Sequence, residues 1–217
     1  MSSITINRDL RGRLGPARDQ GPRPTCLALA MSDAHASVRG PWEALSPEYL
    51  FFHANRREGK PPSSAASIQS IRLATREDGQ PLESGWPYLP TTPPDPTAWI
   101  PPATVGDVFR RNSDVSGEGF DQAWDLATSG EPTVIVMRLS DAFYMPSADG
   151  VVDSPEPGDP DRRHAVVAAA TGGRSGTRYI LVRNSWGPTW GIQGYAWIAE
   201  SYLAPRIIKV IAIKEAA

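Results

Sequence analysis

Cysteine is nearly absent from this 217-residue chain, in which Cys26 is the only one. A single thiol cannot form a disulfide within the chain, and it excludes a zinc site built from several cysteines. The lack of a disulfide framework is typical of a reducing compartment, so we predict a cytoplasmic location. Three interpretations of Cys26 remain: a reactive thiol, a buried and inert one, or an incidental one without a role. Other features of the sequence distinguish between them.

Long apolar runs and an excess of one charge are missing as well. No stretch of about 18 apolar residues is present, and Met1–Arg13 has no apolar centre like that of a secretion signal, so we predict no membrane partner. The 22 Lys and Arg nearly balance the 24 Asp and Glu, for a formal net charge of −2. That balance gives no basic field, and the short pairs Arg56-Arg57 and Arg110-Arg111 do not make a nucleic-acid surface.

Proline and glycine are abundant by contrast, with 22 and 19 residues, and they favour many turns and long ordered loops. The first half predicts helices over Cys26–Val38, from Ser46-Pro47-Glu48 onward, and over Ser64–Glu77. The proline-rich stretch 85–106 predicts an extended connection. The second half predicts a short helix at about Gly119–Thr128 and five strands: Thr133–Leu139, His164–Ala170, Arg178–Arg183, Gly194–Ile198 and Ile207–Ile213. This order indicates an α+β protein in two layers or lobes, with the cleft between them as the default site.

The position of Cys26 at a predicted helix start is chemically informative. Free backbone N–H groups and the helix dipole at that position favour the thiolate over the thiol. A neighbouring imidazole would lower the pKa of the thiol further and would accept its proton. Of the three histidines, His35 and His53 lie within predicted helices and are interpreted as structural or surface residues, whereas His164 opens a predicted strand.

Several segments carry a resemblance to a known family. Residues 184–195, Asn-Ser-Trp-Gly-Pro-Thr-Trp-Gly-Ile-Gln-Gly-Tyr, are similar to the N-S-W-G-x-x-W-G-x-x-G-Y segment of papain-like (C1) cysteine peptidases. His164-Ala-Val-Val resembles the H-A-V strand of that family, and Asp19-Gln20-Gly21 followed by Cys26 resembles its D-Q-G-x-C-G-S-C-W segment. The resemblance covers essentially the whole chain, and the order of the motifs makes it specific.

The resemblance implies an α+β papain-like fold, with an α-helical lobe, a β-rich, barrel-like lobe and the active site in the cleft between them. We expect a single peptidase domain over residues 1–217. The helical lobe would take about residues 11–105 together with 212–217, and the β lobe would take about residues 1–10 and 106–211.

The resemblance also implies roles for four residues. Cys26 would be the nucleophile, and His164 would act as base toward the thiol and as acid toward the leaving amine. Asn184 would hold the imidazole ring through a side-chain hydrogen bond. Gln20 would donate its amide N–H to the oxyanion alongside the backbone N–H of Cys26.

Three further residues complete the implied site. Trp186 would cover the bond between His164 and Asn184 and keep water away, and Arg163 would present its carbonyl to the substrate. Trp190 is interpreted as packing around the glycine turns, with a place on the primed side of the cleft as the alternative. The implied substrate is a protein or peptide, and no metal or organic cofactor is implied.

The chain departs from the family pattern around the nucleophile. Arg23 and Pro24 replace a half-cystine and a glycine, Thr25 takes the place of a serine, and Leu27 replaces the tryptophan after the cysteine. The start of the sequence predicts no room for an inhibitory pro-segment, so restraint would come from narrow specificity, a regulatory partner protein or a closed loop. The acidic stretch 148–163 is a candidate gating loop, although a solvated surface turn is the favoured interpretation.

Alternative functions remain open at this point. An acyl transferase of the transglutaminase or ligase type would use the same thioester, with an amine in place of water. A catalytically silent papain-like binding module is disfavoured because Cys26, His164, Asn184 and Gln20 are all present. Isopeptide specificity of the deubiquitinase type also stays open.

Overall fold

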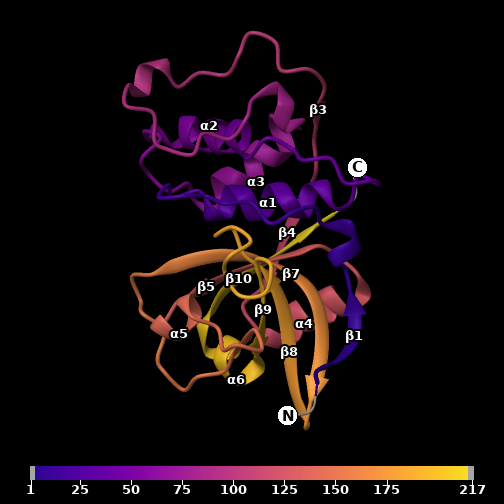
Figure 1. Ribbon diagram of the computed structural model, residues 1–217. Helices are drawn as coiled ribbons and strands as arrows, with labels where there is room; N and C mark the ends of the chain where they lie inside the picture. The colour runs from indigo at the N-terminus through magenta and orange to yellow at the C-terminus, as the bar shows by residue number, and fades with distance from the viewer. Residues whose placement is uncertain (1–2, 215–217) are drawn as a thin grey trace.

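A computed structural model describes residues 3–214 and shows two lobes that meet along helix α1 (Figure 1). The upper lobe holds three helices, α1 (Cys26–Ala36), α2 (Pro47–Glu58) and α3 (Ile68–Glu77). Local sequence explains their ends, because Ser46 Oγ accepts the backbone N–H of Tyr49 while proline follows at the first helical position. Gly59 ends α2 in the left-handed conformation at φ 63°.

The lower lobe is built on one eight-stranded sheet with the order β4-β10-β5-β7-β8-β9-β6, and β1 pairs with β7 outside this path. All pairs are antiparallel except β6 with β9. The strands are β1 (Thr5–Asp9), β4 (Ser113–Gly117), β5 (Thr133–Arg138), β6 (Val151–Val152), β7 (Arg163–Arg174), β8 (Thr177–Arg183), β9 (Tyr195–Ala199) and β10 (Ile207–Ile213). The five strands expected from the sequence are therefore present, with ends that differ by a few residues.

Short elements complete the two lobes. In the sheet lobe, α4 (Phe120–Ser129) occupies the expected helix, whereas the one-turn helices α5 (Asp141–Tyr144) and α6 (Glu200–Leu203) have no counterpart among the expected elements. The remaining short elements are the 3-10 turns η1 (Arg11–Arg13), η2 (Glu83–Gly85), η3 (Pro96–Ala98) and η4 (Ala204–Arg206) and the small strands β2 (Gln80–Pro81) and β3 (Val108–Phe109).

The strands between the lobes serve two apolar cores at once. Alternate residues of β5 point to opposite faces, so that Val134 and Val136 join the core with α1 and α2 while Ile135 and Met137 join the core of the sheet lobe. On β7, likewise, residues 165 and 167 face the helices and residues 166 and 168 face the sheet lobe. Helix α1 and the central strands therefore lie in direct contact, and that contact places the start of α1 against β7.

Two strand ends lie some residues beyond the lobe boundaries expected from the sequence. β3 pairs with β2 of the helical lobe, so the chain enters the large sheet only at β4, several residues beyond the expected boundary near 106. At the other end, β10 continues through Ile213, past the expected boundary at 211. The last residues of the expected crossing, 215–217, lie outside the described part of the chain.

Candidate active site

Cys26 is the first residue of α1, and its side chain is partly exposed. Burial raises the pKa of its thiol, and the backbone N–H groups of Ala165, Leu27 and Cys26 itself act in the opposite direction. The first of these groups belongs to β7 and places the thiol against that strand, next to the residue that follows His164. The structure therefore brings Cys26 and the beginning of β7 together across the lobe boundary.

His164 and Asn184 form a buried hydrogen-bonded pair. His164 Nε2 lies 2.6 Å from Asn184 Oδ1, and the same oxygen accepts the backbone N–H of Ser185 at 2.8 Å. An atom that accepts from a backbone N–H is the amide oxygen, so Nε2 of the histidine must carry the proton that it donates. This tautomer leaves Nδ1 with a free lone pair, which is what a base needs.

The protonation states of Cys26 and His164 differ from the thiolate that the sequence led us to expect. Burial lowers the pKa of His164 to about 4, against a smaller opposing effect of the Asn184 hydrogen bond. Because burial also raises the pKa of Cys26, both shifts favour a neutral thiol and a neutral imidazole in the free chain.

Gln20 is buried at 9% exposure, and both ends of its amide are held. Ser185 Oγ donates to Gln20 Oε1 at 2.7 Å, and Gln20 Nε2 donates to the carbonyl of Arg23 at 2.8 Å. A primary amide has two N–H donors, so the second hydrogen on Nε2 remains for an oxyanion. Ser185, which the sequence reasoning did not single out, thus orients Gln20 while its own N–H binds Asn184.

Aromatic rings surround the imidazole. The Trp186 ring lies 4.7 Å from that of His164, measured between centroids, and Tyr144 stacks on Trp186 at 5.0 Å. Trp190 donates its Nε1–H to the carbonyl of Phe143 at 3.1 Å, and Phe143 itself lies 5.9 Å from His164. Phe143 and Tyr144 belong to α5 and were missed by the sequence reasoning, since a four-residue helix has too little periodicity to be found.

The loop before Cys26 is held by a buried ion pair. Arg23 Nη1 and Nη2 contact the two carboxylate oxygens of Glu48 at 2.5 and 2.9 Å, and both side chains are 0% exposed. Glu48 also accepts Trp99 Nε1 at 2.7 Å and the backbone N–H of Leu89 at 3.1 Å. This buried ion pair therefore ties the loop before Cys26 to α2.

The other two histidines lie apart from this group. His35 is fully buried in α1, with its Nδ1 3.0 Å from Gln80 Oε1, and His53 Nδ1 lies 3.2 Å from a carboxylate oxygen of Asp78. The remaining predicted residue, Arg163, is exposed at the start of β7. Within residues 148–163, Asp149 pairs with Arg174 and Asp153 accepts Ser201, which ties that stretch to the lobe beneath it.

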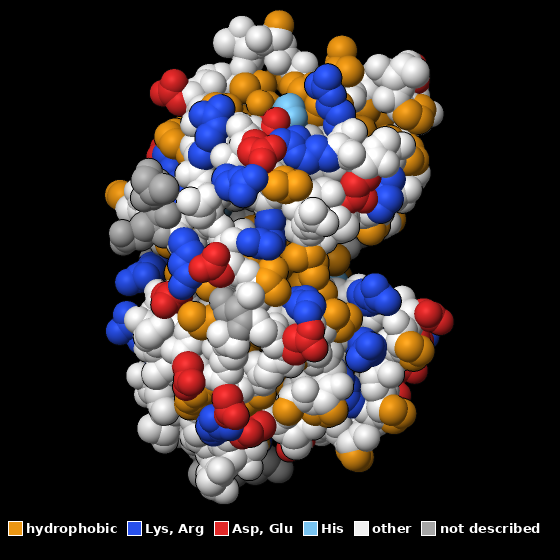
Figure 2. Space-filling model, turned by 180° about the vertical axis from the view of Figure 1, so that it is seen from behind, with side chains coloured by type: hydrophobic (Ala, Val, Ile, Leu, Met, Phe, Trp, Pro, Cys, Tyr) orange, Lys and Arg blue, Asp and Glu red, His pale blue; other side chains and the backbone are white. Residues whose placement is uncertain are grey.

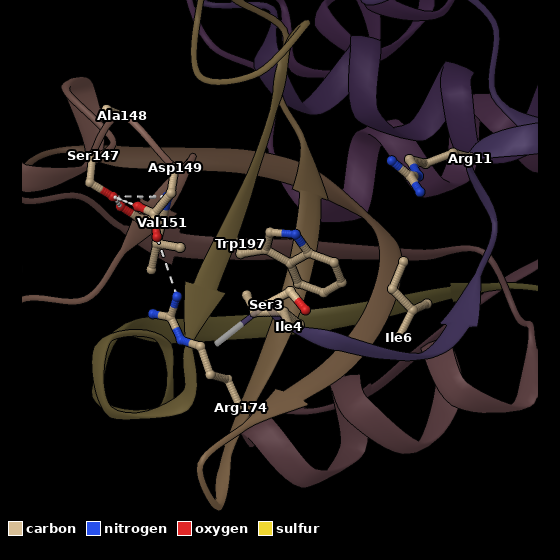
Figure 3. Close-up of a pocket in the computed structure, with 10 residues that line it drawn as sticks. All are labelled: Ser3, Ile4, Ile6, Arg11, Ser147, Ala148, Asp149, Val151, Arg174 and Trp197. Carbon is tan, nitrogen blue, oxygen red and sulfur yellow. Dashed lines mark hydrogen bonds and ion pairs between the residues drawn. The ribbon is translucent and has the colours of Figure 1, made fainter. Parts of the chain in front are cut away.

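Other surface features do not coincide with these residues. The cavity in Figure 3, about 690 Å³, is lined by β1, Trp197 and the segment near Asp149, and it contains none of the predicted site residues. On the face seen in Figure 2, basic and acidic side chains are intermixed over both lobes. Within residues 3–214 there is no group of three or more His, Cys, Asp or Glu side chains arranged to hold a metal, and no helix is long and apolar enough to cross a membrane.

Comparison with known proteins shows which family this chain resembles. Residues 109–210 match the family described as papain family cysteine protease, and the match includes His164, Asn184 and Trp186. Among solved structures, xylellain, a cysteine protease from Xylella fastidiosa, superposes with a TM-score of 0.80 at 22% identity, covering 97% of this chain and 86% of that one. The chain is papain-like in fold and in sequence. The predicted α+β two-lobed papain-like fold is thereby confirmed.

Curated relatives extend the similarity beyond the family match to most of the chain. A cathepsin L-like peptidase of Aedes aegypti is 26% identical over 204 residues, or 91% of this papain-like chain and 59% of the relative. Cathepsin L of Sarcophaga peregrina is 26% identical over 196 residues, or 88% and 57%. The chain thus spans less than two thirds of the length of these relatives.

Proposed function

We propose that this papain-like chain is a thiol-dependent peptidase that cleaves peptide or isopeptide bonds through an acyl-enzyme on Cys26. The observation that carries the proposal is the bond from His164 Nε2 to Asn184 Oδ1, which leaves Nδ1 as a base while the thiol lies against the next residue of β7. The relatives named as cathepsin L-like peptidase and cathepsin L support the same reaction class.

The first half of the reaction would proceed as follows. His164 Nδ1 accepts the thiol proton as Cys26 Sγ attacks the carbonyl carbon, and the carbonyl oxygen becomes an oxyanion. The free N–H of Gln20 Nε2 and the backbone N–H of Cys26 stabilise that oxyanion. The imidazolium then gives its proton to the leaving amine, the C–N bond breaks, and a thioester remains.

The second half returns the enzyme to its starting state. Water attacks the thioester carbon and passes a proton to the neutral His164, and the C–S bond breaks as the acid product forms. The imidazolium then returns its proton to the departing thiolate. Asn184 keeps the ring in one orientation throughout because its Oδ1 stays bound to Nε2. Trp186 lies against the imidazole and limits the access of water to this bond.

The substrate would be a protein or peptide. One similar structure, the Carica candamarcensis protease CMS1MS2, was solved in complex with E-64, with a TM-score of 0.74 and 21% identity over 96% of this chain and 98% of that one. The cytoplasmic location and a regulatory partner protein stay predictions.

The decisive experiment compares the chain with Cys26→Ala on a library of internally quenched peptides. We expect cleavage by the first protein, none by the variant, and a mass increase equal to the acyl group when the reaction is quenched early. Inclusion of a primary amine distinguishes hydrolysis from acyl transfer, since a transferase would yield the amide in place of the acid. A chain that cleaves no peptide and accumulates no thioester would overturn the proposal.

A further inference from the structure

Two arginines beside His164 have no acidic partner in the part of the chain that the structure describes. Arg138 on β5 and Arg163 on β7 pair directly across the ladder, so their Cβ atoms lie about 5 Å apart. Within residues 3–214 neither guanidinium makes an ion pair or a hydrogen bond. Like charges directly opposite one another destabilise a sheet, so this pair is unfavourable unless an anion joins it.

Both side chains project from the face of the sheet that packs against α1. The register between β5 and β7 is unbroken from Arg138 and Arg163 onward, so residues alternate strictly between the two faces. Val136 and Ala165, each two residues away on the same face, pack in the core that contains α1. Arg138 and Arg163 therefore stand on the face that carries Cys26, just past the edge of that core.

The distance to the nucleophile is short. Cys26 packs in the same apolar cluster as Ala165, and Arg163 lies two strand residues away from Ala165, about 7 Å along β7. An extended peptide advances about 3.3 Å per residue. A side chain within two residues of the cleaved bond can therefore reach the two guanidinium groups.

Nearby carboxylates form no ion pair with Arg138 or Arg163 within the described residues. Asp141 and Asp159 both pair with Arg162, at 2.6 and 3.1 Å. Asp161, two residues before Arg163, is exposed and makes no ion pair within the described residues. The sequence thus places acids next to this strand end without neutralising the pair.

A third guanidinium adds to the positive charge. A Cβ placed on Gly158 would meet Arg138 Cβ at 3.1 Å and Arg206 Cγ at 3.2 Å, so these two arginines flank the same glycine. Arg206 is 3% exposed, lies over the Tyr202 ring and makes no ion pair, and its Nε has no hydrogen-bond partner within the described residues. Three cations without carboxylate partners thus lie around one strand end.

We propose that Arg138 and Arg163 form a subsite for a carboxylate side chain of the substrate, which selects peptides with Asp or Glu within two residues of the cleaved bond. This inference rests on the proposed peptidase function. Arginine suits the task because its planar guanidinium binds a carboxylate through two parallel hydrogen bonds.

The test uses quenched peptide libraries in which one position at a time, on either side of the cleaved bond, is fixed as Glu or as the isosteric Gln. We expect the wild-type chain to prefer Glu at one position by about tenfold in kcat/KM, the effect of one charge-assisted hydrogen bond. Arg163→Gln and Arg138→Gln should each reduce that ratio, the double variant should remove it, and Arg163→Glu should shift the preference toward Lys. Arg56→Gln, on an exposed arginine of α2, is the matched control and should leave the ratio unchanged.

Alkylation of Cys26 by neutral iodoacetamide, measured in each variant, separates substrate selection from altered thiol reactivity. Equal cleavage of Glu and Gln libraries at every position, or a preference that survives the double variant, would overturn the subsite while leaving the peptidase function intact. If no library is cleaved, the peptidase function fails. Retention of the two libraries on immobilised Cys26→Ala then decides the subsite, because equal retention rejects it.

Discussion

The Arg23–Glu48 pair makes a strong prediction about stability. Both side chains are 0% exposed, and Arg23 also donates to the carbonyl of Leu89 at 2.7 Å. In Arg23→Met, the Glu48 carboxylate would keep only Trp99 Nε1 and the Leu89 N–H as donors. Removal of one partner of a buried pair leaves an uncompensated charge, so we expect the free energy of unfolding to fall by about 3–5 kcal/mol.

Two further variants test the reason for that loss. Arg23→Met combined with Glu48→Gln removes both charges and keeps an acceptor for Trp99 Nε1, so it should recover at least about 2 kcal/mol of the loss. Arg57→Met removes two partly exposed pairs, one with Glu77 and one with Asp78, and the side chains of these three residues are 25%, 45% and 21% exposed. Exposed pairs contribute less than about 1 kcal/mol, so this control should change little.

Urea unfolding followed by tryptophan fluorescence measures all of these variants. The reasoning is refuted if Arg23→Met costs no more than Arg57→Met, or if the double variant is less stable than the single one. Activity supplies a second measurement, because the carbonyl of Arg23 accepts the Gln20 side chain. A shift of this loop should therefore lower kcat in Arg23→Met even at temperatures where the protein stays folded.

Three further predictions follow from the site and the core. Gln20→Ala removes one proposed oxyanion donor, so kcat should fall by an amount that corresponds to an activation free energy about 3–4 kcal/mol higher. The alkylation rate of Cys26 should stay unchanged; a parallel loss in both rates would mean that Gln20 acts on the thiol and not on the oxyanion. Because burial raises the pKa of Cys26 and lowers that of His164 to about 4, iodoacetamide alkylation should rise with pH around or above the free-thiol value of about 8.5. A rate already at its plateau below pH 7, in a mass-spectrometric time course, would contradict this. Burial also lowers the pKa of His35 to about 4. Between about pH 6.5 and pH 4 this histidine is therefore neutral in the folded state but protonated in the unfolded state. Stability should therefore fall by about 3 kcal/mol between pH 6.5 and 4 on account of His35. Urea titrations at several pH values should show a shallower decline for His35→Gln, and identical slopes would rule the histidine out as the cause.

Patterns within short windows explain what the sequence predicted well. The start of α2 at Ser46-Pro47 and the β-branched run of β5 are local signals, and both elements form where expected. The residues expected at the site came from motifs in chain order. The structure brings Gln20, Asn184 and His164 into one hydrogen-bonded group through Ser185, and the Trp186 ring lies against His164.

Contacts between distant segments were not predictable in this way. The Arg23–Glu48 pair joins residues that no sequence periodicity links. Its expected contribution to stability depends on the complete burial of both side chains, which only the folded chain shows. Tyr88 is a similar case, because its hydroxyl donates to the Gln20 carbonyl at 2.8 Å and lies 2.6 Å from Thr25 Oγ1. The pKa directions at Cys26 and His164 also depend on burial, which overrides the effect that the helix dipole suggests.

Because β5 and β7 supply side chains to both apolar cores, these strands tolerate no change in their pairing register. Since neighbouring residues on each strand feed different cores, a deletion of one residue in the middle of β7 would exchange the two sets of side chains. The same slip would turn His164 away from Asn184 and carry Arg163 to the opposite face. Insertions and deletions should therefore accumulate in the connecting loops, while these two strands tolerate substitution but not a change of length.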